Sequence, residues 1–287
     1  MSAYMRAPRF GFVTCVQLGL DVMDEIYLSG GRLEVLITLV DDAAASKSGR
    51  VFLDEFAVEH EIPLVKIRHI NDAGSIAAIR EYELDWLFII GWSQIASVEV
   101  LSAPTQGCIG MHPTLLPEGR GRASIPWAII KALPATGVTM FQLDTGVDTG
   151  PILAQAHISL GHNTDATELY GKVARAHRQL IRENWDALVD GTISRIPQDR
   201  ETGSVWPGRT PQDGLITQGM NVDTALRLVR ATTHPYPGAF WEADQGIVRV
   251  WRARRASGVS NNPVFRCVDG LVEAMDYDIE ASGRDAG

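Results

Sequence analysis

The chain has 287 residues, of which 45% are hydrophobic and 21% are charged, and its formal net charge at pH 7 is −9. This composition is that of a globular protein and excludes a disordered, collagenous or coiled-coil chain. No segment approaches the roughly 18 consecutive apolar residues of a membrane-spanning helix, and residues 1–10 lack the apolar core of a signal peptide. We therefore expect a cytoplasmic protein without a membrane partner, and the acidic charge argues against a nucleic-acid partner.

The three cysteines are Cys15, Cys108 and Cys267, which lie far apart in the sequence. They form no Cys-x-x-Cys pair, and their number is odd. A disulfide framework and a zinc cluster are both disfavoured by this spacing.

Short apolar segments alternate with amphipathic segments through the first third of the chain. The expected strands cover residues 9–17, 33–40, 63–67 and 85–91. The expected helices cover residues 18–29, 48–61 and 74–83. The strands contain few polar residues and many Val, Ile and aromatic residues, which is typical of strands covered on both faces. We therefore predict an α/β fold with a mostly parallel sheet and helices on both faces.

Polar or glycine-rich residues follow several of the expected strands. Two further strands are expected at residues 107–111 and 136–144, and a long helix at 164–190. Residues 91–97 read GWSQIAS, His112 follows the strand at 107–111, and residues 143–151 read LDTGVDTGP. Ligands of such sheets bind beyond the carboxyl ends of the strands, so these three segments are the candidate site.

The composition changes at residues 197–214, which are rich in proline, glycine and charge. This is linker or turn chemistry, so we expect one domain at 1–204 and a second at 205–287. The second domain is expected to begin with a short helix at 222–233. Alternating patterns at 236–243, 247–256 and 263–276 then predict short strands and a small β-rich domain.

His112 and two aspartates are the candidate catalytic groups. An imidazole titrates near neutrality and suits acid–base chemistry, although, from His112 alone, a structural or surface histidine is the favoured interpretation. Asp144 or Asp148 can orient an imidazole and stabilise its cation, whereas two turn aspartates would make only local hydrogen bonds. The spacing leaves these readings open. Two carboxylates and one distant histidine make a thin ligand set, so we expect no metal.

Two motifs together resemble the folate-dependent formyltransferase family. They are HPTLLPEGRGRASIPWAI (112–129) and TGVTMFQLDTGVDTGPILAQ (136–155), and residues 209–253 resemble the C-terminal domain of some members. The family includes methionyl-tRNA formyltransferases, glycinamide ribonucleotide transformylases and sugar-nucleotide N-formyltransferases. The resemblance implies a Rossmann-like catalytic domain and a small, OB-like C-terminal domain.

The resemblance also implies the co-substrate and the site residues. His112 and Asp148 match the family's catalytic histidine and aspartate. N10-formyltetrahydrofolate would be held by two segments. Their residues are Gly91, Trp92, Ser93, Gln94 and Ala96, and Asp144, Thr145, Gly146 and Val147.

Gly110 departs from the family pattern, which has Asn two residues before the histidine. The Asn would hydrogen-bond the formyl oxygen, and the loss of such a donor costs about 3–4 kcal/mol of transition-state stabilisation. Because His112 and Asp148 are both present, we expect activity to be retained.

The expected acceptor is the amine of a nucleotide-linked aminodeoxysugar. Residues 41–57 carry only two basic residues, Lys47 and Arg50, where the tRNA enzymes tend to have a basic insertion. Arg120 or Arg122 would then meet the diphosphate, because arginine forks match phosphate oxygens. Two alternatives stay open, a methionyl-tRNA formyltransferase and a folate-binding relative without catalysis. A homodimer also stays open.

Overall fold

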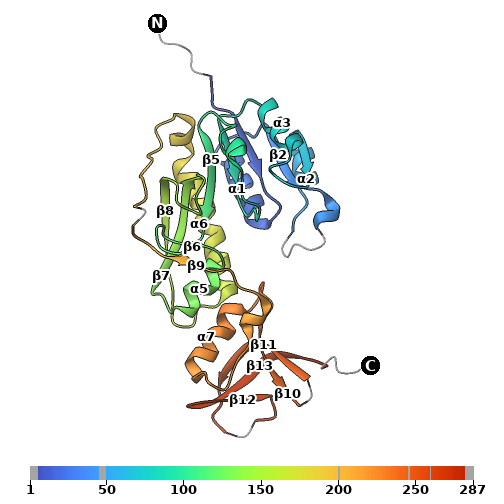
Figure 1. Ribbon diagram of the computed structural model, residues 1–287, viewed down its shortest axis with the longest axis vertical. Coiled ribbons are helices and arrows are strands. Elements are labelled where there is room, and N and C mark those ends of the chain that lie inside the picture. The colour runs from blue at the N-terminus through green and yellow to red at the C-terminus, as the bar shows by residue number, and fades with distance from the viewer. Residues whose placement is uncertain (1–5, 45–49, 200, 245, 259, 282–287) are drawn as a thin grey trace. The chain divides into compact units, whose positions relative to one another are not determined.

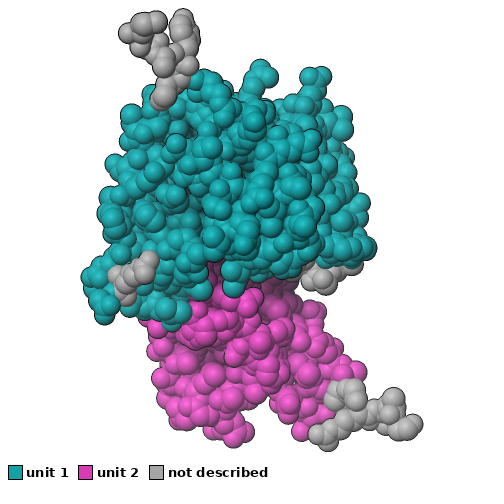
Figure 2. Space-filling model, turned by 45° about the horizontal axis from the view of Figure 1, so that its top comes forward, with its two compact units in different colours: residues 1–120, 137–158, 173–205 teal, residues 121–136, 159–172, 206–287 magenta. Residues whose placement is uncertain are grey.

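A computed structural model describes residues 6–44, 50–199, 201–244, 246–258 and 260–281 (Figure 1). The internal contacts divide the chain into two compact units (Figure 2). Unit 1 comprises residues 1–120, 137–158 and 173–205, and unit 2 comprises residues 121–136, 159–172 and 206–287. The predicted domain boundary near residue 205 stays a prediction.

A seven-stranded sheet has the order β3-β2-β1-β4-β5-β7-β8. Its strands are β1 (Phe10–Val13), β2 (Val35–Leu39), β3 (Leu64–Ile67), β4 (Trp86–Ile89), β5 (Gly107–His112), β7 (Ala135–Gln142) and β8 (Ile152–Ser159). The pairs β1–β2, β2–β3, β1–β4 and β4–β5 are parallel, and β5–β7 is antiparallel. The predicted mostly parallel α/β sheet is confirmed.

The chain winds from β1 through β2 to β3 and then returns to β4 and β5 on the other side of β1. Parallel crossovers are right-handed, so this reversal directs the connecting helices to opposite faces of the sheet. The helices are α1 (Gln17–Leu28), α2 (Asp54–Glu59), α3 (Ala73–Glu81), α4 (Val98–Leu101), α5 (Ser124–Ile130), α6 (Ala166–Val189) and α7 (Val222–Thr232). Such a reversal in strand order is where α/β sheets bind ligands.

One expected helix is shorter than predicted, and one observed strand was not expected. The helix expected at 48–61 begins only at Asp54, because Arg50 forms an antiparallel bridge with Val16 and the amide of Val51 donates to the carbonyl of Cys15. Residues 48 and 49 lie outside the described residues. Strand β8 was not expected. Its residues alternate between polar and apolar, but the strand begins beside a proline-containing turn.

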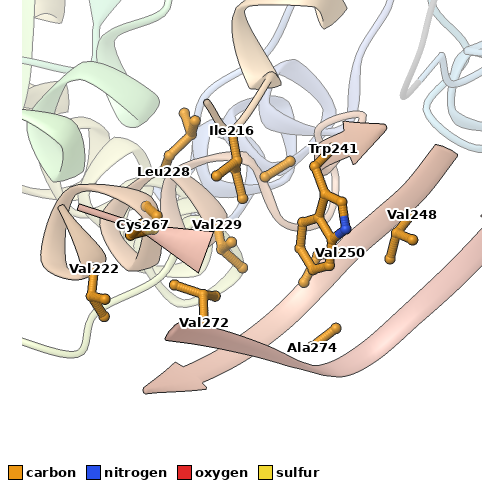
Figure 3. Packing of buried hydrophobic residues seen from close by; sticks show 12 residues of the cluster. Ile216, Val222, Leu228, Val229, Trp241, Val248, Val250, Cys267, Val272 and Ala274 are labelled. Carbon is orange, nitrogen blue, oxygen red and sulfur yellow. The ribbon is translucent and has the colours of Figure 1, made fainter. Parts of the chain in front are cut away.

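The C-terminal part of unit 2 holds an antiparallel sheet with the order β10-β11-β13-β12. Its strands are β10 (Ala239–Ala243), β11 (Gly246–Arg255), β12 (Val264–Cys267) and β13 (Gly270–Glu280). Helix α7 buries Val222, Leu228 and Val229 against Trp241 and Val250 of this sheet, as Figure 3 shows. The predicted small β-rich domain is confirmed.

Short elements complete the described chain. They are β6 (Arg120–Gly121), β9 (Val205–Trp206) and the 3₁₀ helices η1 (Asp41–Ala44) and η2 (Pro211–Gly214). Strands β6 and β9 pair with each other. Within the described ranges, no helix has both the length and the apolar character that crossing a membrane requires.

Candidate active site

His112 is the last residue of β5, at the carboxyl end of the parallel pair β4–β5. The segment 91–97 follows β4 and therefore begins at the same edge of the sheet. The side chain of His112 is largely buried, with a residue exposure of 8%. The structure thus places the predicted histidine where ligands of this fold bind.

Both ring nitrogens of His112 face acceptor oxygens. Nε2 lies 2.7 Å from the carbonyl oxygen of Gly119, and Nδ1 lies 3.7 Å from Oδ2 of Asp148. A ring nitrogen bonded to a carbonyl must carry the proton, so Nε2–H is the donor to Gly119. The distance to Asp148 exceeds a hydrogen bond, so Nδ1 is the nitrogen available for chemistry.

The loop after His112 is fastened to β7 and β8 by two polar side chains. Oγ1 of Thr139 donates to the carbonyl of Thr114 (2.7 Å) and accepts from the amide of Leu116 (3.0 Å). Nε2 of Gln155 donates to the carbonyl of Leu116 (2.8 Å) and to Oγ1 of Thr139 (2.9 Å). The carbonyl of Gly119 is therefore held on a loop with fixed ends.

Asp148 lies in a tight turn between β7 and β8, in the left-handed region with a φ of 54°. A non-glycine residue in that region is strained, and the surrounding contacts must hold it there. Asp144 helps to shape the turn, because its Oδ1 accepts from the amide of Gly146 (3.0 Å) and from Oγ1 of Thr149 (2.7 Å). A Cβ at Gly150 would lie only 1.8 Å from the carbonyl oxygen of Gln142, so this turn needs glycine there.

Gln198 joins the aspartate turn to the loop of His112. Its Nε2 donates to the carbonyl oxygens of Asp148 (2.9 Å) and Gly150 (2.7 Å). Its Oε1 accepts from Nε (3.1 Å) and Nη2 (2.9 Å) of Arg120. One amide side chain thus braces both segments that carry the candidate catalytic pair.

Arg120 and Arg122 differ in what their side chains contact. Arg120 is 6% exposed, and besides Gln198 it donates to the carbonyl oxygens of Thr202 and Asp199. These internal bonds argue against its predicted role at a substrate diphosphate. The exposed Arg122 lies in unit 2, and its proposed role at a diphosphate stays a prediction.

The space beside Gly110 is filled by apolar side chains. A Cβ at this position would lie 2.7 Å from Cδ2 of Leu143 and 3.2 Å from Cε1 of Phe141. Gly110 pairs with Phe141 across the β5–β7 ladder and has regular strand geometry. The glycine is therefore explained by close packing rather than by an unusual backbone angle.

The first segment predicted to bind folate, and the residue just before the second, pack on one hydrophobic cluster of unit 1. Trp92 and Ala96 of the first segment contact this cluster, as does Leu143, the residue before Asp144. Nε1 of Trp92 is buried and has no hydrogen-bond partner among the described residues. The role of the two segments in folate binding stays a prediction.

Other residues of these segments are exposed or hold the backbone in place. Gly91 has a φ of 63°, and a Cβ there would lie 2.1 Å from Cγ2 of Val16. Gln94 fastens its loop to the segment after β3, since Oε1 accepts from the amide of Ile70 (2.8 Å) and Nε2 donates to the carbonyl of Arg68 (2.9 Å). The exposed members are Gly91, Ser93, Thr145, Gly146 and Val147.

Sequence reasoning missed Gln198, Thr139 and Gln155. Gln198 lies in the segment interpreted as a linker, and its partners in the aspartate turn lie 48 and 50 residues earlier. No local spacing signals such a contact. A glutamine inside a proline- and charge-rich segment is unremarkable until the fold is known.

A second histidine lies deeper in unit 1. His177 on α6 is fully buried, and its Nδ1 lies 2.8 Å from the carbonyl of Val173. Burial lowers the pKa of His177 to about 4, and the charge of His112 adds to that lowering. His177 is therefore neutral near pH 7. Where the structure describes the chain, no three His, Cys, Asp or Glu side chains are arranged to hold a metal ion.

Comparison with protein families identifies the chain. The family model described as formyl transferase matches residues 41–184, and the model of the formyl transferase C-terminal domain matches residues 209–276. The chain belongs to the formyl transferase family. The matched regions include His112, Asp148 and helix α7.

Individual relatives agree with this assignment. A methionyl-tRNA formyltransferase of Ruminiclostridium cellulolyticum is 35% identical over 198 residues, which are 69% of this chain and 63% of the relative. The chain thus spans less than two thirds of the length of that relative.

Two solved structures share the fold. HypX from Aquifex aeolicus in complex with tetrahydrofolic acid has a TM-score of 0.68 and 17% identity, and the match covers 96% of this chain and 44% of HypX. An N-formyltransferase from Helicobacter canadensis in complex with folinic acid and dTDP-3-aminofucose has a TM-score of 0.67 and 16% identity, with 96% and 99% covered. At these identities the likeness shows the fold alone.

Proposed function

We propose that this protein transfers the formyl group of N10-formyltetrahydrofolate to a primary amine, with His112 and Asp148 as the catalytic pair. The observation that carries the proposal is the placement of the His112 ring between the carbonyl of Gly119 and the carboxylate of Asp148. Family membership supplies the reaction class. The position of the pair at the carboxyl edge of the sheet agrees with it.

The segments 91–97 and 144–147 would hold the co-substrate. Trp92 offers an aromatic face and a buried Nε1 that has no hydrogen-bond partner in the described part of the chain. Each segment also carries an exposed apolar side chain, Ile95 in the first and Val147 in the second. An aromatic, partly apolar surface with one unused donor fits a flat heteroaromatic ring system. When bound, the co-substrate supplies an activated formyl group for attack by an amine.

His112 would then transfer the proton, and Asp148 would stabilise the charge on its ring. The Nδ1–H of cationic His112 would donate to the formyl oxygen as negative charge develops on it, which is the usual way to stabilise such an oxygen. The same proton would pass to the departing folate nitrogen, and His112 would recover a proton from the attacking amine. Asp148 would keep the ring cationic.

Gly110 has no side chain that could donate a hydrogen bond to the formyl oxygen. His112 would therefore be the main donor to that oxygen. Leu143 and Phe141 pack where a side chain at position 110 would project, and neither offers a hydrogen bond. The oxygen therefore relies on His112. We expect transfer to be more sensitive to loss of the histidine than in a site with two donors.

Methionyl-tRNA is the first candidate acceptor. It is favoured by the 35% identity to a methionyl-tRNA formyltransferase, which outweighs the preference for an aminosugar drawn from charge and from the short segment at 41–57. An acidic chain still binds RNA where basic residues cluster locally.

A nucleotide-linked aminosugar is the second candidate acceptor. It is favoured by the net charge of −9 and by the shared fold with the N-formyltransferase that is complexed with dTDP-3-aminofucose. The two candidates differ in size and charge, so one assay separates them.

The test is a formylation assay with N10-formyltetrahydrofolate. One arm contains charged initiator tRNA, and the other contains a panel of nucleotide-linked aminosugars read by mass spectrometry. Formylation in one arm identifies the acceptor class. Tight folate binding without transfer in either arm would contradict the proposed activity and would indicate a folate-binding relative that lacks catalysis.

A further inference from the structure

Unit 2 contains a cavity that takes no part in the site described above. Its volume is about 230 Å³. Three segments form its wall, namely the end of α5 with the following turn (128–134), the residues before α6 (160–164) and one face of α7. All three segments lie inside unit 2. Its size is below the roughly 300–1,000 Å³ of sites for drug-sized ligands, so it suits a single chemical group.

The floor of the cavity is apolar, whereas one wall is cationic. Ile129, Leu133 and Leu160 contribute aliphatic surface, and Arg227 and Arg230 of α7 line the same cavity. These arginines are three positions apart on a helix, so their side chains lie on the same face, and two like charges at that spacing repel each other.

Arg230 is poorly satisfied by the protein itself. Its Nε is buried and has no hydrogen-bond partner within the described residues. Burial lowers the pKa of Arg230, the charge of Arg227 lowers it further, and Asp165 and Asp223 offset part of that effect. No ion pair within 4 Å joins either carboxylate to Arg230 in the described chain. Buried donors without a partner call for an explanation, and a ligand is one of the usual ones.

We propose that this cavity binds a phosphate group between Arg227 and Arg230. A guanidinium presents its N–H groups in a planar fork that matches phosphate oxygens, and such charge-assisted bonds are strong. A bound dianion would also remove the repulsion between the two arginines. Thr164 and His162 also line the cavity and present further polar atoms. The phosphate is either inorganic or part of a nucleotide or RNA backbone, since all three share this chemistry.

The test uses the full chain. It measures the Tm with and without each probe, and the binding of each probe by calorimetry. The probes are inorganic phosphate, a nucleoside diphosphate and a short RNA duplex, each at constant ionic strength. We expect at least one probe to raise the Tm. Arg227→Gln and Arg230→Gln should each weaken binding by about tenfold or more. The probe that binds most tightly identifies the source of the phosphate.

Arg266→Gln is the matched control, because Arg266 is exposed on β12 and does not line the cavity. It removes the same charge and should leave binding unchanged. Without phosphate, Arg227→Gln should not lower the Tm, because it relieves the repulsion. Equal binding by wild type and both cavity variants would overturn the proposal. So would the absence of binding by wild type to all three probes, or a clear fall in the Tm of Arg227→Gln without phosphate.

Discussion

Nδ1 of His112 lies 3.7 Å from Oδ2 of Asp148, while Nε2 of the same ring is bonded to the carbonyl of Gly119. Under the proposed mechanism, the carboxylate lies where it would stabilise positive charge that develops on the ring. Asp148→Asn removes the charge and keeps the shape of the side chain. We expect kcat for formyl transfer to fall about 100-fold, within the usual range for acid–base groups.

Asp186→Asn is the control for that variant, because Asp186 is exposed on α6 and loses the same charge. Both variants should keep the wild-type Tm within a few degrees. If Asp148→Asn retained the kcat of Asp186→Asn, Asp148 would have no role in the chemistry.

The brace formed by Gln198 predicts a separation of stability from activity. Gln198→Glu keeps an acceptor for Arg120 but loses the donor to the carbonyls of Asp148 and Gly150. The aspartate turn should then shift, and displacements of about 1 Å lower rates up to about 100-fold. We expect a Tm near wild type and a kcat reduced by about 10- to 100-fold.

Gln198→Ala serves as the contrast, because it also leaves the buried guanidinium of Arg120 without its side-chain acceptor. It should lower both the Tm and kcat. Wild-type kcat in Gln198→Glu, measured with saturating substrates, would rule out a positioning role for this side chain.

The packing at Gly110 predicts coupling with Leu143. Gly110→Asn places a Cβ 2.7 Å from Cδ2 of Leu143, and such overpacking costs about 1–3 kcal/mol of the free energy of unfolding. Leu143→Ala makes room for the new side chain. In a double-mutant cycle by chemical denaturation, the double variant should be more stable than the sum of the single effects predicts. Strict additivity would contradict this packing.

Much of the fold was predictable from the sequence. The apolar strands β1, β2 and β4 are buried on both faces, so their composition alone indicates a sheet covered by helices. The helix expected at 164–190 matches α6 because its pattern is long and strongly amphipathic. Strand β8 was not predicted, because the alternation of its polar and apolar residues begins beside a proline-containing turn.

The candidate site was predictable only in part. His112 and Asp148 lie in local motifs, so a sequence pattern finds them. Their mutual distance, the internal contacts of Arg120 and the hydrogen bonds of Gln198 depend on segments up to 82 residues apart in the sequence. No periodicity or spacing in the chain encodes such contacts.

His177 predicts a pH dependence of stability. The unfolded chain protonates this histidine below its ordinary pKa of 6.5, whereas the folded protein does so only near pH 4, because burial lowers the pKa to about 4. The contribution of neutral His177 to the free energy of unfolding is therefore fully present above pH 6.5. It is lost as the pH falls toward 4. The loss should reach about 3 kcal/mol.

The measurement is the free energy of unfolding by urea at several pH values, compared between wild type and His177→Phe. The variant lacks this group and should show a smaller decline between pH 6.5 and 4. His157→Gln removes an exposed histidine and should follow wild type. Parallel curves for all three proteins would show that burial does not lower the pKa of His177.

The central claim is that His112 carries the proton in formyl transfer from N10-formyltetrahydrofolate. The most direct measurement is single-turnover formyl transfer by wild type and His112→Asn to the acceptor that the formylation assay identifies, with folate binding measured in parallel. We predict that wild type transfers the formyl group. We predict that the variant still binds folate but transfers the formyl group at a rate at least about 100-fold lower. Wild-type transfer by His112→Asn would contradict the account.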